Sequence, residues 1–342
     1  MPQAFTTPWR RKKRSRAKVK RAGAAAAALV ACALFASGCG LRSASGIVLD
    51  ADPGTVKHHD SLEGVHINVA SKNFTEQLIL GNMLSILLNT AGADITNLTN
   101  TPGSFGVRAG LLNGNIDISP EYTGTGWITY LGHENPVEGS KAQWLAVKKE
   151  DKKKNDLSWL KPSPENNTYA LAIREKKGKQ LGITKLSQLK DLPKKELTFC
   201  VESEFAHRND GFVPMLKTYG LKKSDLGKVT TLDTGVVYTA TADGACNFGE
   251  VFTTDGRIPG LNLRVLQDDK HFFPRYNLTE VIQGDLLRAH PELKTIFGKL
   301  NPKLTNKVML KLNAKVDEDG EDPAIVARDW LVKEGLVTLP KS

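Results

Sequence analysis

Among the residues that could do covalent chemistry, the four cysteines are those whose roles the sequence indicates most clearly. Two of the four lie in strand-like runs, Cys200 in Leu-Thr-Phe-Cys-Val and Cys246 in Cys-Asn-Phe-Gly-Glu-Val. In an oxidising compartment such a pair favours a disulfide, and the alternative is two buried free thiols. The local sequence of neither cysteine supplies an orienting histidine, so we do not expect a catalytic thiol.

A third cysteine closes an N-terminal export signal. Nine Lys and Arg between Arg10 and Arg21 precede an apolar run of 15 residues, Ala22 to Ala36, and Ser-Gly-Cys39 follows. A basic region, a short apolar region and small residues are typical of a secretory signal. The ending resembles a bacterial lipobox, although Ala36 stands where such motifs usually carry Leu. We therefore interpret 1–39 as a lipoprotein signal peptide and Cys39 as the lipidated residue, because the run is shorter than the ~20 residues that span a bilayer.

The leader also accounts for the basic character of the chain. The whole sequence has a formal net charge of +10, but residues 1–39 hold nine of its Lys and Arg and no Asp or Glu. Without them the net charge falls to +1. The basic patch therefore leaves with the signal peptide, and we expect no nucleic-acid partner.

The rest of the chain alternates strand and helix patterns. Residues 40–63 are polar and lack periodicity, as a tether would, and the folded body follows. Strands are predicted at 66–70, 116–118 and 169–173. Helices are predicted where apolar residues recur at helical spacing after Asn73, at 107–113, and from Asp322-Pro323 onward. Asn73 and Glu76 are spaced as an N-cap and its reciprocal carboxylate. Strands separated by helices indicate an α/β fold, and the turn formers at 162–167 mark a candidate crossing between two domains.

Motifs for catalysis are missing from this body. It has no phosphate-binding Gly-Lys-Ser/Thr loop, no dinucleotide fingerprint, no nucleophile elbow and no histidine pair with metal-ligand spacing. We expect no cofactor, no metal and no enzymatic activity. An exported α/β protein of this kind points to binding.

Four strings together resemble one family, the glycine betaine/carnitine/choline-binding lipoproteins of osmoprotectant ABC importers. They are Ser71–Gln77 (SKNFTEQ), Glu121–Thr125 (EYTGT), Asn166–Ala170 (NNTYA) and Thr253–Arg257 (TTDGR), supported by 202–211 and 268–276. The resemblance implies a two-domain periplasmic-binding fold, type II-like, with two crossover hinges and a ligand cleft between the domains. The expected domains are 64–165 with 257–342, and 166–256.

The resemblance also implies partners and a location. It predicts a small quaternary ammonium ligand, ABC permease and ATPase subunits, and a lipid anchor on the extracytoplasmic face of the cell membrane, in a Gram-positive bacterium. The protein itself is expected to be a monomer.

The family binds its ligand in an aromatic cage. A quaternary ammonium has no N–H to donate, so aromatic faces supply both negative potential and apolar contact, about 0.5–2 kcal/mol for each desolvated pair. By motif match the cage positions are Tyr122, Tyr169, Tyr238 and Phe252. Phe252 departs from the tyrosine usual at its position, which keeps the ring face and removes a hydroxyl.

The ligand's carboxylate requires the opposite surroundings. Lys72 stands just before a predicted helix N-terminus, where backbone N–H groups also favour an anion. By the same resemblance, Thr125 and Arg208 also match carboxylate contacts, and Asn167 matches a polar position beside the cage. Lys72 and Arg208 together favour a zwitterion such as a betaine or carnitine over choline.

Three other functions remain open at this point. The same fold could bind another amino acid or a polyamine, which would call for an acidic residue facing the amine, and Glu121 is the candidate. An exported enzyme of choline or betaine metabolism would need a cofactor or nucleophile motif. A ligand sensor that partners a membrane kinase cannot be separated from a transport component by sequence.

Overall fold

The computed structural model describes residues 46–341. The predicted signal peptide and Cys39 therefore lie outside the described residues, as does the start of the predicted tether. Among the described residues, no helix has the length and apolar character needed to cross a membrane.

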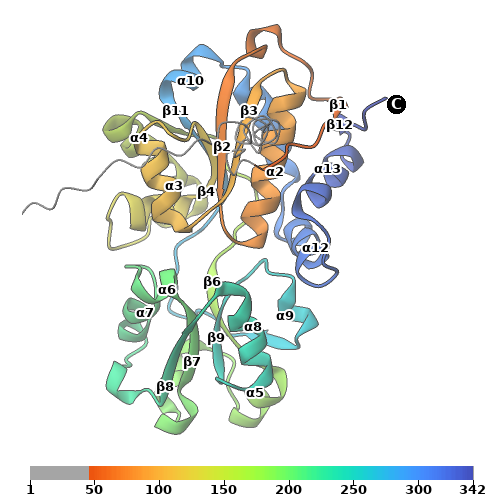
Figure 1. The fold of residues 1–342 in the computed structure, drawn as a ribbon. Helices are drawn as coiled ribbons and strands as arrows, with labels where there is room; N and C mark the ends of the chain where they lie inside the picture. The colour runs from red at the N-terminus through yellow and green to blue at the C-terminus, as the bar shows by residue number, and fades with distance from the viewer. Residues whose placement is uncertain (1–45, 342) are drawn as a thin grey trace, which may run out of the picture. The chain divides into compact units, whose positions relative to one another are not determined.

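The first of two five-stranded mixed sheets has the strand order β3-β2-β4-β11-β5 (Figure 1). β2 is parallel to β3 and β4, and β11 is antiparallel to β4 and β5. The strands are β2 (His66–Lys72), β3 (Asp94–Thr101), β4 (Ile118–Tyr122), β5 (Leu157–Trp159) and β11 (Leu278–Gln283). The helices of this domain are α2 (Thr75–Thr90), α3 (Gly103–Leu112), α4 (Ser140–Asn155), α10 (Gly284–Ala289), α11 (Leu293–Leu300), α12 (Asn306–Asp317) and α13 (Pro323–Lys333).

Short elements complete this domain. Strands β1 (Asp52–Pro53) and β12 (Val337–Thr338) pair with each other near the two ends of the described chain. The remaining turns are η1 (Asp60–Leu62), the π-helical η2 (Thr125–Tyr130) and η6 (Asn301–Lys303).

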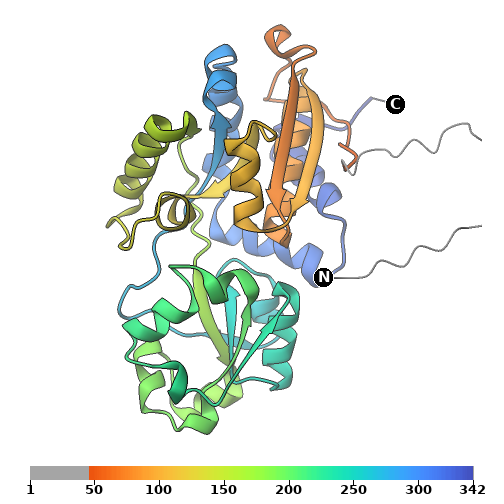
Figure 2. The ribbon, with the colours of Figure 1, turned by 60° about the vertical axis from the view of Figure 1, so that its left-hand side comes forward.

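The second sheet has the order β10-β6-β9-β7-β8 (Figure 2). β7 is parallel to β8 and β9, whereas β6 is antiparallel to β9 and β10. Its strands are β6 (Tyr169–Arg174), β7 (Thr198–Glu202), β8 (Lys228–Leu232), β9 (Phe248–Phe252) and β10 (Leu263–Val265). Its helices are α5 (Glu175–Leu181), α6 (Ser203–His207), α7 (Phe212–Thr218), α8 (Thr234–Asp243) and α9 (Arg257–Gly260), with turns η3 (Leu186–Asp191), η4 (Lys194–Glu196) and η5 (Lys223–Asp225).

Two segments connect the sheets, as expected for two α/β domains with two crossings. The first runs through residues 160–168, between β5 and β6, and includes the turn formers at 162–167. The second lies between β10 and β11. The expected return to the first domain at residue 257 is too early, because β10 pairs with β6 in the second sheet.

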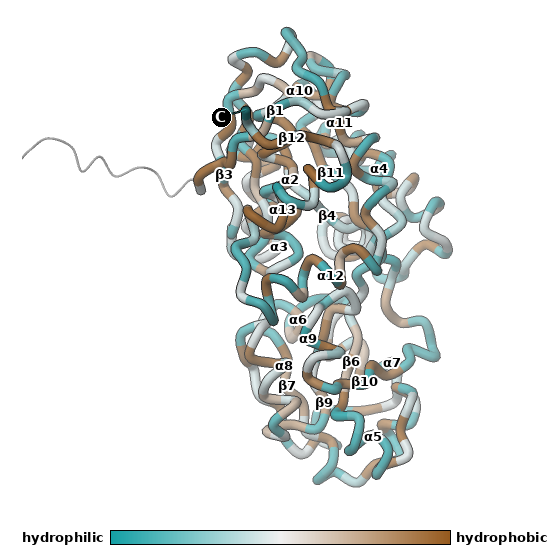
Figure 3. Tube along the Cα trace, turned by 90° about the vertical axis from the view of Figure 1, so that its right-hand side faces the viewer, coloured by the Kyte–Doolittle hydropathy of each residue, from teal (hydrophilic) through white to brown (hydrophobic). Residues whose placement is uncertain are grey.

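Helices cover both faces of each sheet because neighbouring strand residues point to opposite sides. Val69 of β2 belongs to the core cluster that includes Met83 of α2, whereas its neighbour Ala70 belongs to the cluster of Val107 of α3. Figure 3 shows hydrophobic residues along α13, which packs on α2, whereas α5 is mostly hydrophilic. Burying each large apolar side chain contributes roughly 1.5–3 kcal/mol.

Helix α13 begins as the sequence predicts, whereas α2 begins without the predicted cap. Asp322 caps α13, its carboxylate accepting from the Ala324 N–H at 2.7 Å. At α2 the expected cap pair does not form. The N-cap is Phe74 with no side-chain cap bond, and Asn73 instead accepts from the Gly103 N–H at 3.0 Å. The carboxylate of Glu76 is therefore free for other contacts.

A disulfide joins Cys200 in β7 to Cys246, which stands just before β9. Their Cα atoms are 5.8 Å apart, within the range that such a bond spans without backbone movement. Both cysteines are buried. The bond links two neighbouring strands inside the second domain.

Candidate ligand site

Loops that follow strands of both sheets surround a cavity of about 490 Å³. Seven of the eight predicted ligand contacts line it, namely Lys72, Tyr122, Thr125, Asn167, Tyr169, Arg208 and Phe252. A larger cavity of about 790 Å³ shares Tyr169 with it but contains none of the other predicted contacts. The smaller cavity is therefore the candidate site.

Aromatic rings from both domains converge in this cavity. Tyr169 at the start of β6 and Phe252 at the end of β9 are register partners, with ring centroids 5.2 Å apart. Phe74, at the start of α2, stacks on Phe252 at 4.9 Å and lies 6.4 Å from the ring of Tyr122. Three predicted rings are thus brought together, and Phe74 joins them.

Tyr238 does not line the cavity, contrary to its assignment to the cage. It lies in α8 with 1% of its surface exposed, and it packs with Ala170 and Val251 on a separate core cluster. Its hydroxyl oxygen accepts from the Phe252 N–H at 2.8 Å, and the Arg257 guanidinium lies 4.2 Å from its ring centroid. Tyr238 therefore stabilises the end of β9 from the protein core and not from the cavity.

Tyr276, like Phe74, is an aromatic residue that lies within the sequence strings given above but was not assigned to the site. It lines the cavity from the second crossing, edge-on to Tyr169 with centroids 5.6 Å apart. Its hydroxyl donates to Asp210 Oδ2 at 2.8 Å. Burial, followed by the Asp210 charge, raises the pKa of Tyr276 well above its usual value, so the phenol stays protonated and can keep donating.

Lys72 brings a cation to the first-domain side of the cavity. Its Nζ lies 2.5 Å from Glu121 Oε1, and the carboxylate of Glu121 is fully buried. The same Nζ stands 4.9 Å from the ring centroid of Tyr122. The ammonium is therefore held by one carboxylate and faces one cage ring.

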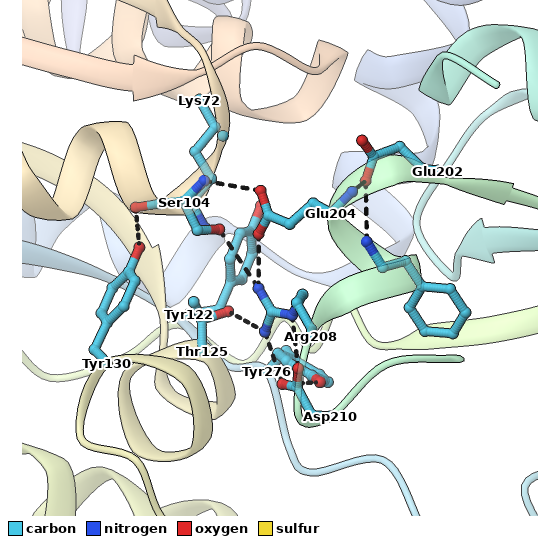
Figure 4. A network of polar contacts seen from close by, with 12 residues as sticks. Lys72, Ser104, Tyr122, Thr125, Tyr130, Glu202, Glu204, Arg208, Asp210 and Tyr276 are labelled. Atoms are coloured by element: carbon cyan, nitrogen blue, oxygen red, sulfur yellow. Dashed lines mark hydrogen bonds and ion pairs between the residues drawn. The ribbon is translucent and has the colours of Figure 1, made fainter. Parts of the chain in front are cut away.

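Arg208 brings a second cation from the other domain (Figure 4). Its guanidinium makes two bonds to Asp210, at 2.6 and 2.7 Å, and one to Glu204 at 2.9 Å. Its Nη2 also approaches the Thr125 hydroxyl at 3.4 Å, and its Cζ lies 5.3 Å from the ring centroid of Tyr169. Thr125 and Arg208, predicted as carboxylate contacts, are thus neighbours across the two domains.

Glu204 adds an anion beside these cations. Its Oε2 accepts from the Ser104 N–H at 2.9 Å, at the start of α3, where the helix dipole favours negative charge. Burial alone would raise the pKa of Glu204, but the charges of Arg208 and Lys72 bring it below its usual value. The cavity wall therefore holds an ionised carboxylate as well as two cations.

Asn167 lines the cavity and is linked to Tyr122 through Glu76. Its amide donates to Glu76 Oε1 at 2.9 Å, and the hydroxyl of Tyr122 donates to the same oxygen at 2.7 Å. Burial and then the charge of Glu76 raise the pKa of Tyr122 well above its usual value. Aromatic faces, two cations and hydrogen-bond donors thus share one cavity, which is the chemistry that a methylated ammonium with a carboxylate requires.

Residues 65–333 match the model of the family described as the substrate-binding domain of ABC-type glycine betaine transport systems. The chain belongs to this family. Its members are binding proteins rather than enzymes, and in ABC importers they work on the extracytoplasmic side of the membrane. The two-domain fold predicted from the sequence is confirmed.

Individual relatives agree with this assignment. A glycine-betaine-binding protein of Pseudomonas aeruginosa is 37% identical over 279 residues, 79% of this chain and 88% of that protein. A solved structure described as a glycine betaine/carnitine/choline ABC transporter is 31% identical, with a TM-score of 0.65, and the match covers 78% of this chain and 98% of that one.

A third relative is named for a different ligand. The ergothioneine transport permease/ergothioneine binding protein EgtU of Helicobacter pylori is 34% identical over 278 residues. The match covers 81% of this chain and 49% of that protein, so the present chain corresponds to about half of it.

Proposed function

We propose that this protein captures a trimethylammonium zwitterion of the glycine betaine or carnitine type and delivers it to an ABC permease with its ATPase. One observation carries the proposal: aromatic rings and two cations from both domains face a single cavity. The ligand's ammonium would lie against Phe74, Tyr122, Tyr169 and Phe252. Ring faces of this kind favour a methylated cation by about 0.5–2 kcal/mol each.

The ligand's carboxylate would lie toward Lys72, Arg208 and Thr125, which line the same cavity. Both cations already have carboxylate partners, Glu121 and Asp210. These partners hold the cations in place before the ligand arrives, so less side-chain freedom is lost on binding. A ligand with a carboxylate gains from both cations, whereas choline gains nothing there.

Phe252 stands where the family resemblance predicts a tyrosine. Its backbone N–H is held by the Tyr238 hydroxyl, so the ring is fixed although it has no hydroxyl of its own. We propose that the loss of that hydroxyl changes which ligand tails are accepted while the ammonium contact is kept.

The volume of the cavity limits how large the bound zwitterion can be. The cavity of about 490 Å³ lies within the range of roughly 300–1,000 Å³ for small-molecule sites. It therefore has room for a betaine with a longer tail, such as carnitine or ergothioneine. An ordinary amino acid or a polyamine would need a carboxylate facing its amine. Glu121, the candidate, does not line the cavity and is paired with Lys72, and Glu204, which does line it, is paired with Arg208.

We further propose that Cys39 carries the lipid anchor on the outer face of a Gram-positive cell membrane, and that the protein acts as a monomer. The pattern of basic, apolar and small residues before Cys39 supports the anchor. Metabolic labelling with a radioactive fatty acid should mark the wild-type chain and leave a Cys39→Ala chain unlabelled. Labelling of both chains would contradict the anchor.

Isothermal titration tests the ligand directly. Protein of residues 40–342 would be titrated with glycine betaine, carnitine, ergothioneine, choline and proline. We expect saturable heat with at least one trimethylammonium zwitterion, weaker binding of choline, and none of proline. Binding of proline alone, or of a polyamine alone, would contradict the proposed ligand class.

A further inference from the structure

The carboxylate of Glu76 accepts four hydrogen bonds although only 2% of the residue is exposed. Its Oε1 accepts from Tyr122 and Asn167, at 2.7 and 2.9 Å. Its Oε2 accepts from the Thr254 hydroxyl at 2.5 Å and from the Asn313 amide at 3.1 Å. A buried carboxylate is costly unless it is hydrogen-bonded, and here four donors compensate it.

These donors come from separate parts of the fold. Tyr122 ends β4 and Asn313 lies in α12, both in the first domain. Asn167 lies in the first crossing, and Thr254 follows β9 of the second domain. Two further bonds connect the donors to one another, from Thr254 N–H to Asn167 Oδ1 at 3.3 Å and from the Asn313 amide to the Thr254 carbonyl at 2.7 Å.

Each aromatic ring of the cage is close in sequence to this carboxylate or to one of its donors. Phe74 stands two residues before Glu76, Tyr169 two after Asn167, and Phe252 two before Thr254, while Tyr122 binds Glu76 itself. The contact network of one carboxylate therefore fixes the backbone beside four rings that come from distant parts of the chain.

The surroundings of Glu76 contain one further carboxyl. Glu165 is fully buried and accepts no hydrogen bond from the rest of residues 46–341. Burial, then the charge of Glu76 and a hydrogen bond between the two carboxyls, raise the pKa of Glu165 well above its usual value. Its neutral form is thereby favoured, so Glu165 does not compete as an anion for the four donors of Glu76.

We propose that Glu76 is the positioning residue of the ligand site. It holds the rings of the two domains in the mutual arrangement that binds the ligand, without touching the ligand. The proposal rests on the proposed function for its ligand readout. Because prearranged rings lose little freedom on binding, the effect belongs to affinity as well as to stability.

The test is Glu76→Gln in the full chain, titrated with whichever zwitterion the wild type binds. Glutamine keeps the size, loses the charge that strengthens the bonds, and replaces one of the two acceptor oxygens with an NH2 group that cannot accept the two bonds made there. We expect the dissociation constant to rise roughly 10- to 100-fold, the equivalent of one or two charge-assisted hydrogen bonds. The rise should come from faster dissociation with little change in association rate.

Glu280→Gln provides the matched control. Glu280 of β11 is equally buried, with 2% of its surface exposed. Its carboxylate accepts from the Asn301 amide at 2.8 Å, and it does not line the cavity. Its loss should lower the melting temperature and leave affinity within about 2-fold, because neither Glu280 nor its partner Asn301 lines the cavity. If Glu76→Gln also lowers the melting temperature but binds with the wild-type constant and dissociation rate, the positioning role is refuted.

A gentler pair covers the case in which Glu76→Gln fails to fold. Thr254→Val removes one donor to Glu76, and Thr241→Val removes a fully buried hydroxyl in α8 that donates to the Val237 carbonyl at 2.7 Å and does not line the cavity. We expect about a 5- to 10-fold loss of affinity for Thr254→Val and none for Thr241→Val. Equal losses for both variants would overturn the proposal.

A ligand-free measurement separates this inference from the proposed function. Hydrogen–deuterium exchange of Glu76→Gln should rise together at 122–125, 167–170 and 252–255, and exchange of Glu280→Gln should not rise there. If wild type binds no ligand in the panel, the proposed function fails, while the exchange result still decides the role of Glu76. Unchanged exchange at all three segments would refute it.

Discussion

The two halves of the cavity repeat one arrangement with different parts. In the first domain, Lys72 faces the ring of Tyr122 and is paired with Glu121. In the second, Arg208 faces the ring of Tyr169 and is paired with Asp210. Each half thus offers an aromatic face and a cation whose charge is balanced by a buried carboxylate.

The halves differ in what else the cation touches. Lys72 is a point charge, and its ion pair with Glu121 lies within its own domain. Arg208 bonds Asp210 with two nitrogens, as lysine cannot, and also reaches Ser104 and Thr125 of the other domain. If the proposed function holds, Lys72 would serve the ligand alone, whereas Arg208 would serve both the ligand and the contact between domains.

Removing a ring from the second half should have the largest effect. Tyr169 contacts Phe205, Phe252 and Tyr276 as well as Arg208. Tyr169→Ala should therefore weaken binding roughly 100-fold or more, the sum of a lost cation–π contact and lost ring burial. Titration calorimetry measures the loss, and circular dichroism checks that the fold is intact. Wild-type affinity in a folded variant would remove Tyr169 from the site.

Arg208→Lys keeps the charge and removes the two-nitrogen bond to Asp210. We expect affinity to fall about 10-fold or more and ligand-induced compaction to shrink, as small-angle X-ray scattering measures. If compaction is unchanged while affinity falls, Arg208 serves the ligand alone and the difference between the halves disappears.

Lys72→Ala should act on the ligand's charge. Glycine betaine or carnitine should lose about 10-fold in affinity, and choline, which has no carboxylate, about 3-fold or less. Parallel titrations with the two ligand types give the ratio. Equal losses for both would place Lys72 outside the carboxylate site.

The smallest effect on binding is expected from Tyr238→Phe. The variant leaves the Phe252 N–H without its acceptor, which costs about 1–3 kcal/mol of stability. Affinity should change by about 2-fold or less, since Tyr238 does not line the cavity. Thermal denaturation and titration together distinguish this supporting role from a cage role, for which the affinity loss would exceed the stability loss.

Sequence strings located most of this site because strand ends are easy to recognise. Tyr122 ends the run of β4, and Tyr169 begins the run of β6, which is antiparallel to β9. Both therefore lie at the sheet edge where the carboxyl ends of the parallel strands face a cleft in α/β domains. Tyr238 was misplaced because a helix turns each side chain by its own angle, and a motif does not say which face is buried. The return of the chain was placed too early because β10, Leu-Arg-Val, is too short to carry a strand pattern.

Glu76 and Phe74 show a different limit. Their spacing after Asn73 matches a helix cap, and local pattern favours that interpretation. The carboxylate instead meets donors from residues up to 237 positions away. No local pattern contains those partners, so tertiary contacts decided the outcome. Phe74 likewise lies before the helix and lines the cavity, because α2 starts at Thr75, one residue later than an N-cap at Asn73 would place it.

Tyr276 has a consequence for transport itself. It belongs to the segment that returns the chain to the first domain, and it meets both the Tyr169 ring and Asp210 of the second. A bulkier ligand that displaces Tyr169 must also press on this connecting segment. Occupancy and the degree of closure are therefore separate quantities, and two solutes held equally tightly need not be handed to the permease at the same rate.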